Sequence, residues 1–197
     1  MTKTDQLRQI RDELVALTES PLYDYRTANK YYPVPGMGNH DAKIMFIGEA
    51  PGENEAKQGR PFVGAAGKFL DELLKSIDLS REDIFITNIV KDRPPDNRDP
   101  SKAEIALYSP FLDRQIDIIQ PQVIATLGRF SMTWLLTRYN SPDKAKTITA
   151  LHGQTIPLQA NFGTISMVAL FHPAQALYDP SKRDIQFTDF KVLEQFK

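Results

Sequence analysis

The chain has 197 residues, of which 41% are hydrophobic, and a formal net charge of −1, which is typical of a soluble globular protein without strong overall attraction to nucleic acid. It has no cysteine, which excludes disulfides and thiolate metal sites. It has neither a signal-peptide pattern nor an apolar run of membrane-spanning length, so we expect a cytoplasmic protein.

The first forty residues combine a helical pattern with an irregular segment. Apolar residues recur every three or four positions from Leu7 to Leu17, which predicts an amphipathic helix over residues 4–17. Residues 20–40 are rich in Tyr, Pro and Gly. They predict an ordered loop that wraps the domain, because so many tyrosines are unusual in a free tail.

From residue 43 onward, strand and helix patterns alternate. Apolar runs predict strands over 43–48, 84–89, 122–127 and 165–171. Helices are expected over 65–77, 101–119 (opened by a Ser-x-x-Glu capping box), 128–136 and after residue 180, and a hairpin around Gly153 within 140–163. The alternation predicts one domain over 1–197, a three-layer α/β/α sandwich with a central, mainly parallel four-stranded sheet.

The loops that follow these strands carry motifs of one enzyme family. The motifs are Gly48-Glu-Ala-Pro-Gly52 with Gly59-Arg-Pro-Phe-Val-Gly-Ala-Ala-Gly67, Thr87-Asn-Ile-Val-Lys91 with Arg93-Pro-Pro-Asp-Asn-Arg98, and Phe171-His-Pro-Ala174. Their order and spacing over residues 21–178 resemble the family 4 uracil-DNA glycosylases. The resemblance implies an enzyme of base-excision repair that hydrolyses the N-glycosidic bond of uracil in DNA and leaves an abasic site.

The chain departs from this family in one respect. The family normally holds a four-cysteine iron–sulfur cluster, and Leu17, Ser20, Asp92 and Tyr108 stand at the cysteine positions. These residues cannot jointly ligate such a cluster, and we expect no cofactor. We expect packing around Tyr108, with Asp92 paired to a nearby Arg or Lys, to hold the 20–40 loop instead.

The resemblance places a uracil pocket at the ends of the strands. Phe62 would stack on the base beside Ala50, and Asn88 would bond O4 and N3–H, a pattern that cytosine lacks. His172 would donate to O2, where negative charge develops as the bond breaks. From the residues alone, Phe62 could also be a core side chain, Asn88 a turn residue and His172 a surface or capping residue.

Two carboxylates are candidates for stabilising the sugar cation and orienting water, by analogy with glycoside hydrolysis. They are Glu49 and Glu55, with Asn97 as a water-positioning partner. The sequence leaves open which carboxylate contacts the water, and Glu49 could instead tie the loop backbone together. Relatives that trap the sugar covalently carry a basic insert with a histidine in the loop corresponding to 91–100. Here that loop is short and has no histidine, so the resemblance implies hydrolysis with release.

DNA contacts are expected on the same rim. The candidates are Arg60, Arg98, Arg129, Ser131, Leu177 and Arg183, with Lys91, Arg93 and Lys182 in the same loops. Ser131 lies near a helix N-terminus that suits a phosphate. Leu177 would fill the space that the base leaves, although it could also be a core residue. The expected partner is uracil-containing DNA, single- or double-stranded, bound by a monomer without membrane association.

Two other functions remain open, and a third is disfavoured. The chain could be a non-catalytic relative that binds damaged DNA, or a glycosylase for another deaminated base such as hypoxanthine. A nucleotide-binding module is disfavoured, because no Gly-x-Gly-x-x-Gly follows the first strand.

Overall fold

The structure is a computed structural model that describes residues 1–197. Its sheet has six strands in the order β1-β3-β2-β4-β6-β5. The four central strands are parallel, and the two edge strands pair antiparallel to them. The strands are β1 Met37–Gly38, β2 Ile44–Gly48, β3 Ile84–Asn88, β4 Val123–Leu127, β5 Thr155–Ala160 and β6 Gly163–Leu170.

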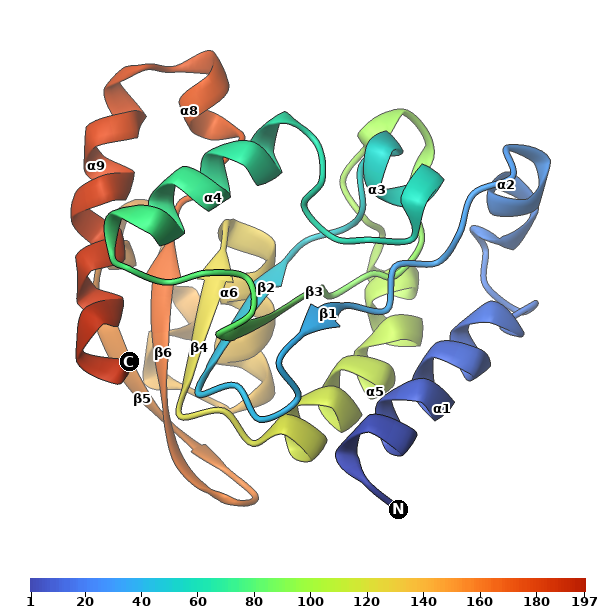
Figure 1. The fold of residues 1–197 in the computed structure, drawn as a ribbon, viewed down its shortest axis with the longest axis horizontal. Coiled ribbons are helices and arrows are strands. Elements are labelled where there is room, and N and C mark those ends of the chain that lie inside the picture. The colour runs from blue at the N-terminus through green and yellow to red at the C-terminus, as the bar shows by residue number, and fades with distance from the viewer.

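Helices cover both faces of this sheet (Figure 1). The α-helices are α1 Lys3–Val15, α2 Tyr23–Ala28, α3 Glu53–Gln58, α4 Ala65–Ser76, α5 Lys102–Ile119, α6 Arg129–Arg138, α7 Ile148–Leu151, α8 Gln175–Tyr178 and α9 Ser181–Phe190. Three 3₁₀ turns are η1 Pro95–Asn97, η2 Pro142–Ala145 and η3 Lys191–Phe196. The capping box of Ser101 and Glu104 at the start of α5 is present as predicted.

The two faces of the central strands supply two separate cores. On β2, Met45 and Ile47 pack with α1, α5 and α6, whereas Ile44 and Phe46 pack with α4, α9 and η3. Every residue of β2, β3 and β4 is buried. These strands therefore appear in the sequence as continuous apolar runs, because both of their faces are covered.

The prediction of four strands is wrong, because it missed both edge strands. β1 has only two residues and lies within the Tyr/Pro/Gly-rich segment. β5 alternates between exposed and buried residues and contains Pro157, which is tolerated at a sheet edge where the missing N–H faces away from the ladder. Neither strand forms an apolar run, so the rule that located the buried strands does not apply to them.

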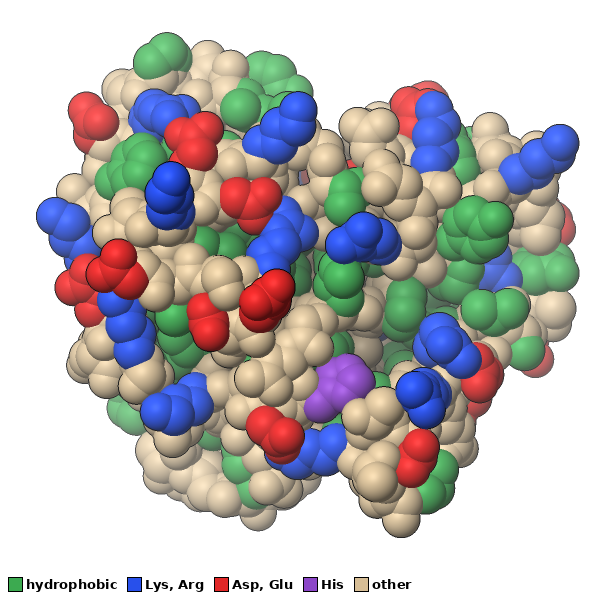
Figure 2. All heavy atoms as spheres, viewed as in Figure 1, with side chains coloured by type: hydrophobic (Ala, Val, Ile, Leu, Met, Phe, Trp, Pro, Cys, Tyr) green, Lys and Arg blue, Asp and Glu red, His purple; other side chains and the backbone are tan.

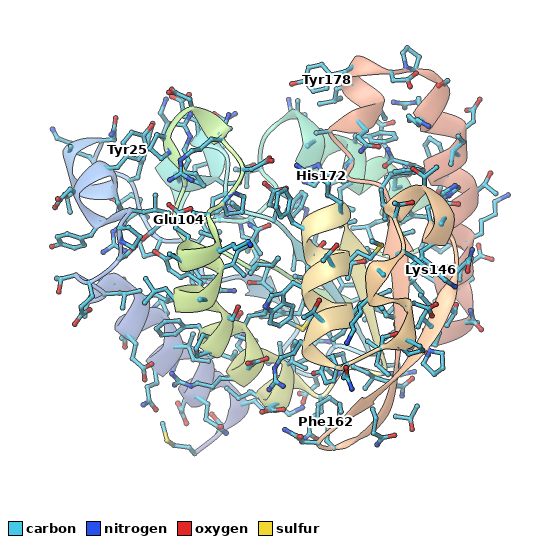
Figure 3. The ribbon with its side chains drawn as sticks, turned by 180° about the vertical axis from the view of Figure 1, so that it is seen from behind. Tyr25, Glu104, Lys146, Phe162, His172 and Tyr178 are labelled. Atoms are coloured by element: carbon cyan, nitrogen blue, oxygen red, sulfur yellow. The ribbon has the colours of Figure 1, made fainter.

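Two further local predictions differ from the structure. Residues 20–40 contain the short helix α2 and strand β1 rather than loop alone. The hairpin joins β5 to β6 through residues 161–162, whereas Gly153 lies before β5. In Figure 3, Phe162 of this hairpin lies at the end of the sheet opposite His172.

The carboxyl ends of the parallel strands meet at one edge of the sheet, where α3 and α8 also lie (Figure 1). In an open α/β sheet this is the edge where ligands bind.

No helix of the structure combines the length and apolar character needed to cross a membrane.

Candidate active site

A cavity of about 570 Å³ opens at this edge of the sheet. Its walls come from the segments after β2, β3 and β6, which are far apart in the sequence. The predicted residues that line it are Glu49, Ala50, Glu55, Phe62, Asn88, Asn97, Arg98, His172 and Leu177. The three expected to bind the base, Phe62, Asn88 and His172, therefore share one cavity.

The end of β2 must be glycine for this cavity to form. A Cβ atom on Gly48 would lie 2.3 Å from the Asn88 Oδ1 atom and 2.9 Å from the Phe62 Cζ atom. Any side chain at position 48 would displace the amide or the ring. The glycine therefore lets both groups approach the end of the strand closely.

Phe62 stands in a strained loop conformation that other residues hold in place. Its φ is +52°, which is rare for a residue with a side chain, and its ring stacks on His172 with centroids 5.8 Å apart. The Arg81 guanidinium donates hydrogen bonds to the carbonyl oxygens of Pro61, Phe62 and Gly67. Sequence reasoning missed Arg81, because nothing in its local pattern connects it with a loop nearly twenty residues earlier.

Glu55 ties the same loop together. Its Oε1 atom accepts hydrogen bonds from the backbone N–H groups of Val63 and Gly64, both at 2.8 Å. The backbone-tying role that the sequence allowed for Glu49 thus falls to Glu55. The Glu55 carboxylate also lies close enough to His172 to favour the protonated form of that ring.

Glu49 has no side-chain hydrogen bond and faces the cavity. Burial raises the pKa of Glu49 to about 7; the negative charge of Asp99 adds to this shift and Arg129 opposes it. A carboxyl group without a structural partner, with a pKa near neutrality, is suited to proton transfer or to stabilising positive charge.

His172 follows β6 and is neutral at physiological pH. Burial lowers the pKa of His172 to about 4, against the opposing effect of Glu55. The Nδ1 atom accepts a hydrogen bond from the Ala174 N–H at 3.1 Å. The ring proton of the neutral form must therefore reside on Nε2, which leaves one N–H donor for a ligand.

Asn97 is placed in the cavity wall with its amide oxygen already engaged. Its φ is +53°, a conformation that asparagine tolerates better than most residues. The Oδ1 atom accepts a hydrogen bond from Arg93 Nε at 2.9 Å. Its amide nitrogen makes no hydrogen bond within the protein and is therefore available to position a water molecule.

The predicted DNA-contact residues divide into exposed and buried side chains. Arg60 is exposed and unpaired, whereas Arg98, Arg129 and Arg183 are exposed and form ion pairs with Glu104, Asp99 and Glu72. The Ser131 side chain is buried and donates to the Gly128 carbonyl, so only the backbone amides at this helix N-terminus are left for the predicted phosphate contact. Lys91 is also fully buried, so it cannot be a rim contact. On the face drawn in Figure 2, Lys and Arg are interspersed with Asp and Glu rather than gathered in one basic patch.

The tip of α8 projects at the mouth of the cavity. Leu177 is 46% exposed, so it is not a core residue, and the neighbouring Tyr178 is 87% exposed. Figure 3 shows Tyr178 at this tip, beyond His172, which lies deeper at the end of β6. Sequence reasoning did not single out Tyr178, because an aromatic residue in a polar loop carries no periodic signal.

The four positions expected to replace cysteines do not suit an iron–sulfur cluster, which is bound through thiolates. Three of them form a hydrogen-bonded chain: the Tyr108 hydroxyl donates to Asp92 at 2.6 Å and lies 2.7 Å from Ser20 Oγ. Arg26 Nη1 lies 3.1 Å from Asp92 Oδ2, which confirms the expected ion pair. Burial, with the Asp92 charge, raises the pKa of Tyr108 and keeps it a phenol. Leu17 packs against the core beside α1.

Comparison with known proteins shows the family to which the chain belongs. The sequence profile described as "Uracil DNA glycosylase superfamily" matches residues 35–195, so the chain belongs to this superfamily. Type-4 uracil-DNA glycosylases from Sulfurisphaera tokodaii and Saccharolobus solfataricus are each 45% identical to it over 97% of the chain. The matched regions make up 84% and 86% of these two relatives, respectively. The type-4 enzyme of Archaeoglobus fulgidus is 40% identical over 96% of the chain and 92% of its own length. Within the superfamily, the chain belongs to the type-4 family.

Proposed function

We propose that the chain is a monofunctional uracil-DNA glycosylase, acting as a monomeric single domain that hydrolyses the N-glycosidic bond of uracil in DNA. The observation that supports this most directly is the convergence of Phe62, Asn88 and His172 on one cavity in a type-4 family chain. DNA glycosylases turn the target nucleotide out of the stack into such a pocket, at a cost of a few kcal/mol.

The base is recognised by its edge and its face. The buried Asn88 amide donates to uracil O4 and accepts from N3–H, while the Phe62 ring packs on the base. Cytosine presents an amino group at the fourth position and no N3–H, so it would leave the amide unpaired. An unpaired buried polar group makes such discrimination steep.

His172 stabilises the departing base. Its Nε2–H donates to uracil O2 as the glycosidic bond breaks and negative charge develops there. The ring needs no proton from solvent for this role, because its low pKa, about 4, keeps it neutral and the Ala174 N–H fixes the tautomer. A donor aimed at developing charge typically accelerates a reaction by two to three orders of magnitude.

Glu49 stabilises the sugar cation and orients the attacking water. We assign this role to Glu49 rather than to Glu55, because Glu55 is committed to two backbone N–H groups whereas the Glu49 carboxyl is unpaired. The Asn97 amide nitrogen is a second group that can bond the water. The water adds to the sugar carbon, its proton leaves to solvent or Glu49, and uracil departs with the bonding electron pair.

This role predicts a pH dependence. Because Glu49 acts as the carboxylate and its pKa is about 7, the single-turnover rate of uracil excision should fall about tenfold for each pH unit below that value and level off above it. His172 stays neutral in this range. Rates measured from about pH 5 to about pH 8.5 should lose this dependence in Glu49→Gln and keep it in Glu82→Gln, an exposed control. A flat wild-type profile would contradict the assignment.

The DNA contacts follow from the mouth of the cavity. The side chain of Leu177 enters the space left by the extruded nucleotide, and exposed Arg60, Arg98, Arg129 and Arg183 contact phosphates. Three of these arginines must exchange acidic partners for phosphate. Binding should therefore be modest and strongly dependent on salt.

The proposed function is tested with oligonucleotides containing one uracil, one hypoxanthine or only normal bases, each single- and double-stranded. Alkali cleaves the strand wherever a base has been removed. A break at uracil alone is the expected result. Breaks only at hypoxanthine would identify the other deaminated base as the substrate, and binding without any break would favour the non-catalytic alternative.

A further inference from the structure

Lys91 is a fully buried lysine without an acidic partner. It follows the turn after β3, its exposed fraction is 0%, and Nζ lies 2.7 Å from each of three oxygen atoms. These are Thr87 Oγ1, the Asn88 main-chain oxygen and Gln115 Oε1. A lysine is almost never fully buried unless it is paired, so this arrangement requires an explanation.

The surrounding bonds orient all three oxygens toward the ammonium group. The Gln115 amide nitrogen donates to the Pro35 carbonyl at 2.6 Å, which turns its Oε1 atom toward Lys91. The Thr87 hydroxyl donates to the same carbonyl at 3.0 Å and keeps its lone pairs for Lys91. The three acceptors match the three N–H donors of an ammonium ion.

The three oxygen atoms form a cage around Lys91 Nζ. This cage lies behind Asn88, the proposed uracil-reading residue, as seen from the cavity. Lys91 bonds the main-chain oxygen of Asn88, whose side chain faces the cavity. After Asn88 the chain bonds to the end of β2: the Ile89 N–H donates to the main-chain carbonyl of Gly48, and the Val90 N–H donates to the main-chain carbonyl of Glu49. Lys91 closes this turn from inside the protein and thereby restrains the backbone that carries the Asn88 amide.

We propose that Lys91 is a positioning residue for base excision, which holds Asn88 from behind and places an uncompensated positive charge near the wall where the uracil anion forms. The inference rests on the proposed function. No charged side chain accompanies Lys91 in the cage: its neighbours from β3, α5 and the segment before β1 are Thr87, Gln115 and Pro35. Burial lowers the pKa of Lys91, while the three short bonds favour its charged form.

The first test is Lys91→Met, which keeps the length of the side chain and removes its donors and charge. The single-turnover rate of uracil excision should fall roughly 10- to 100-fold, less than for a donor that touches the oxyanion directly. Binding of DNA that already contains an abasic site should stay within about threefold, because phosphate contacts supply most of that affinity. A folded variant with the wild-type rate would overturn the proposal.

A second test separates charge from packing. The chain has no native cysteine, so Lys91→Cys carries the only thiol and can be alkylated while unfolded and then refolded. An S-aminoethyl group restores a lysine-like ammonium, and an S-propyl group has the same number of heavy atoms without the charge. The aminoethyl protein should recover most of the wild-type rate and the propyl protein should not. Equal recovery by both would overturn the electrostatic role.

Backbone positioning has its own readout, independent of activity. The amides of Ile89 and Val90 should exchange with solvent faster in Lys91→Met than in the wild-type protein, because the turn that they close loses its internal anchor. Unchanged exchange would overturn the positioning role. A wild-type protein that fails to excise uracil would contradict the proposed function alone, since the exchange experiment still tests Lys91.

Discussion

Replacing Asn88 by aspartate is expected to reduce uracil excision roughly 10⁴- to 10⁵-fold, the range by which a site built to hydrogen-bond a substrate rejects an analogue that lacks the matching group. Asn88 is only 2% exposed and lines the cavity. An aspartate of nearly the same shape removes the N–H donor to uracil O4. It also places a negative charge beside a base that becomes an anion.

Single-turnover kinetics with a uracil-containing oligonucleotide would measure this loss. Asn161→Asp is the matched control, because Asn161 is exposed in the β5–β6 turn. The next residue, Phe162, lies at the end of the sheet opposite His172 (Figure 3). The control should retain the wild-type rate. If Asn88→Asp folds and retains full activity, the base-reading role is wrong, although the family assignment is unaffected.

The second large effect concerns stability. Arg26→Met should lower the free energy of unfolding by about 3 to 5 kcal/mol, the usual cost of leaving a buried charge without its partner. Arg26 is 4% exposed and Asp92 is 1% exposed. The guanidinium bonds Asp92 and also the carbonyl oxygens of Leu14 and Val15 at the end of α1. Its loss therefore frees both a carboxylate and a helix end.

Urea denaturation at neutral pH would measure the change, with Arg11→Met as the control. Arg11 pairs with Asp12 on the exposed surface of α1, where an ion pair contributes at most about 1 kcal/mol. Burial raises the pKa of Asp92 and the Arg26 charge opposes that rise, so the carboxyl should take up a proton more readily once Arg26 is gone. Lowering the pH through that pKa should therefore recover part of the stability lost in Arg26→Met. An equal loss in both variants would contradict a structural role for the ion pair.

Several parts of the molecule could be predicted because their signals are local. Buried parallel strands appear as short apolar runs, and the turn to helix α5 appears as Ser-x-x-Glu. Since the ends of parallel strands share one edge, the sequence also predicted that Phe62, Asn88 and His172 would lie together. Their common cavity agrees with that expectation.

Other parts depended on contacts between distant residues. Arg81 supports the Phe62 loop, and Glu55 rather than Glu49 binds its backbone. Lys91 and Ser131 are both buried, although their loops were expected to face DNA. A polar side chain near a strand end can point toward solvent or into the protein. Its direction depends on acceptors supplied by other segments, such as Gln115 for Lys91, and the Gln115 amide is itself oriented by its bond to the Pro35 carbonyl.

The sequence by itself determined the alternation of strands and helices, the edge of the sheet that carries the site, and the absence of thiolate ligands, because each follows from residue type and spacing along the chain. Only the tertiary structure decided which carboxylate is unpaired, which tautomer His172 adopts, and how Ser20, Asp92, Tyr108 and Arg26 join where cysteines were expected. Hydrogen bonds, burial and the pKa shifts that they cause arise between residues brought together by folding, and no local pattern encodes them.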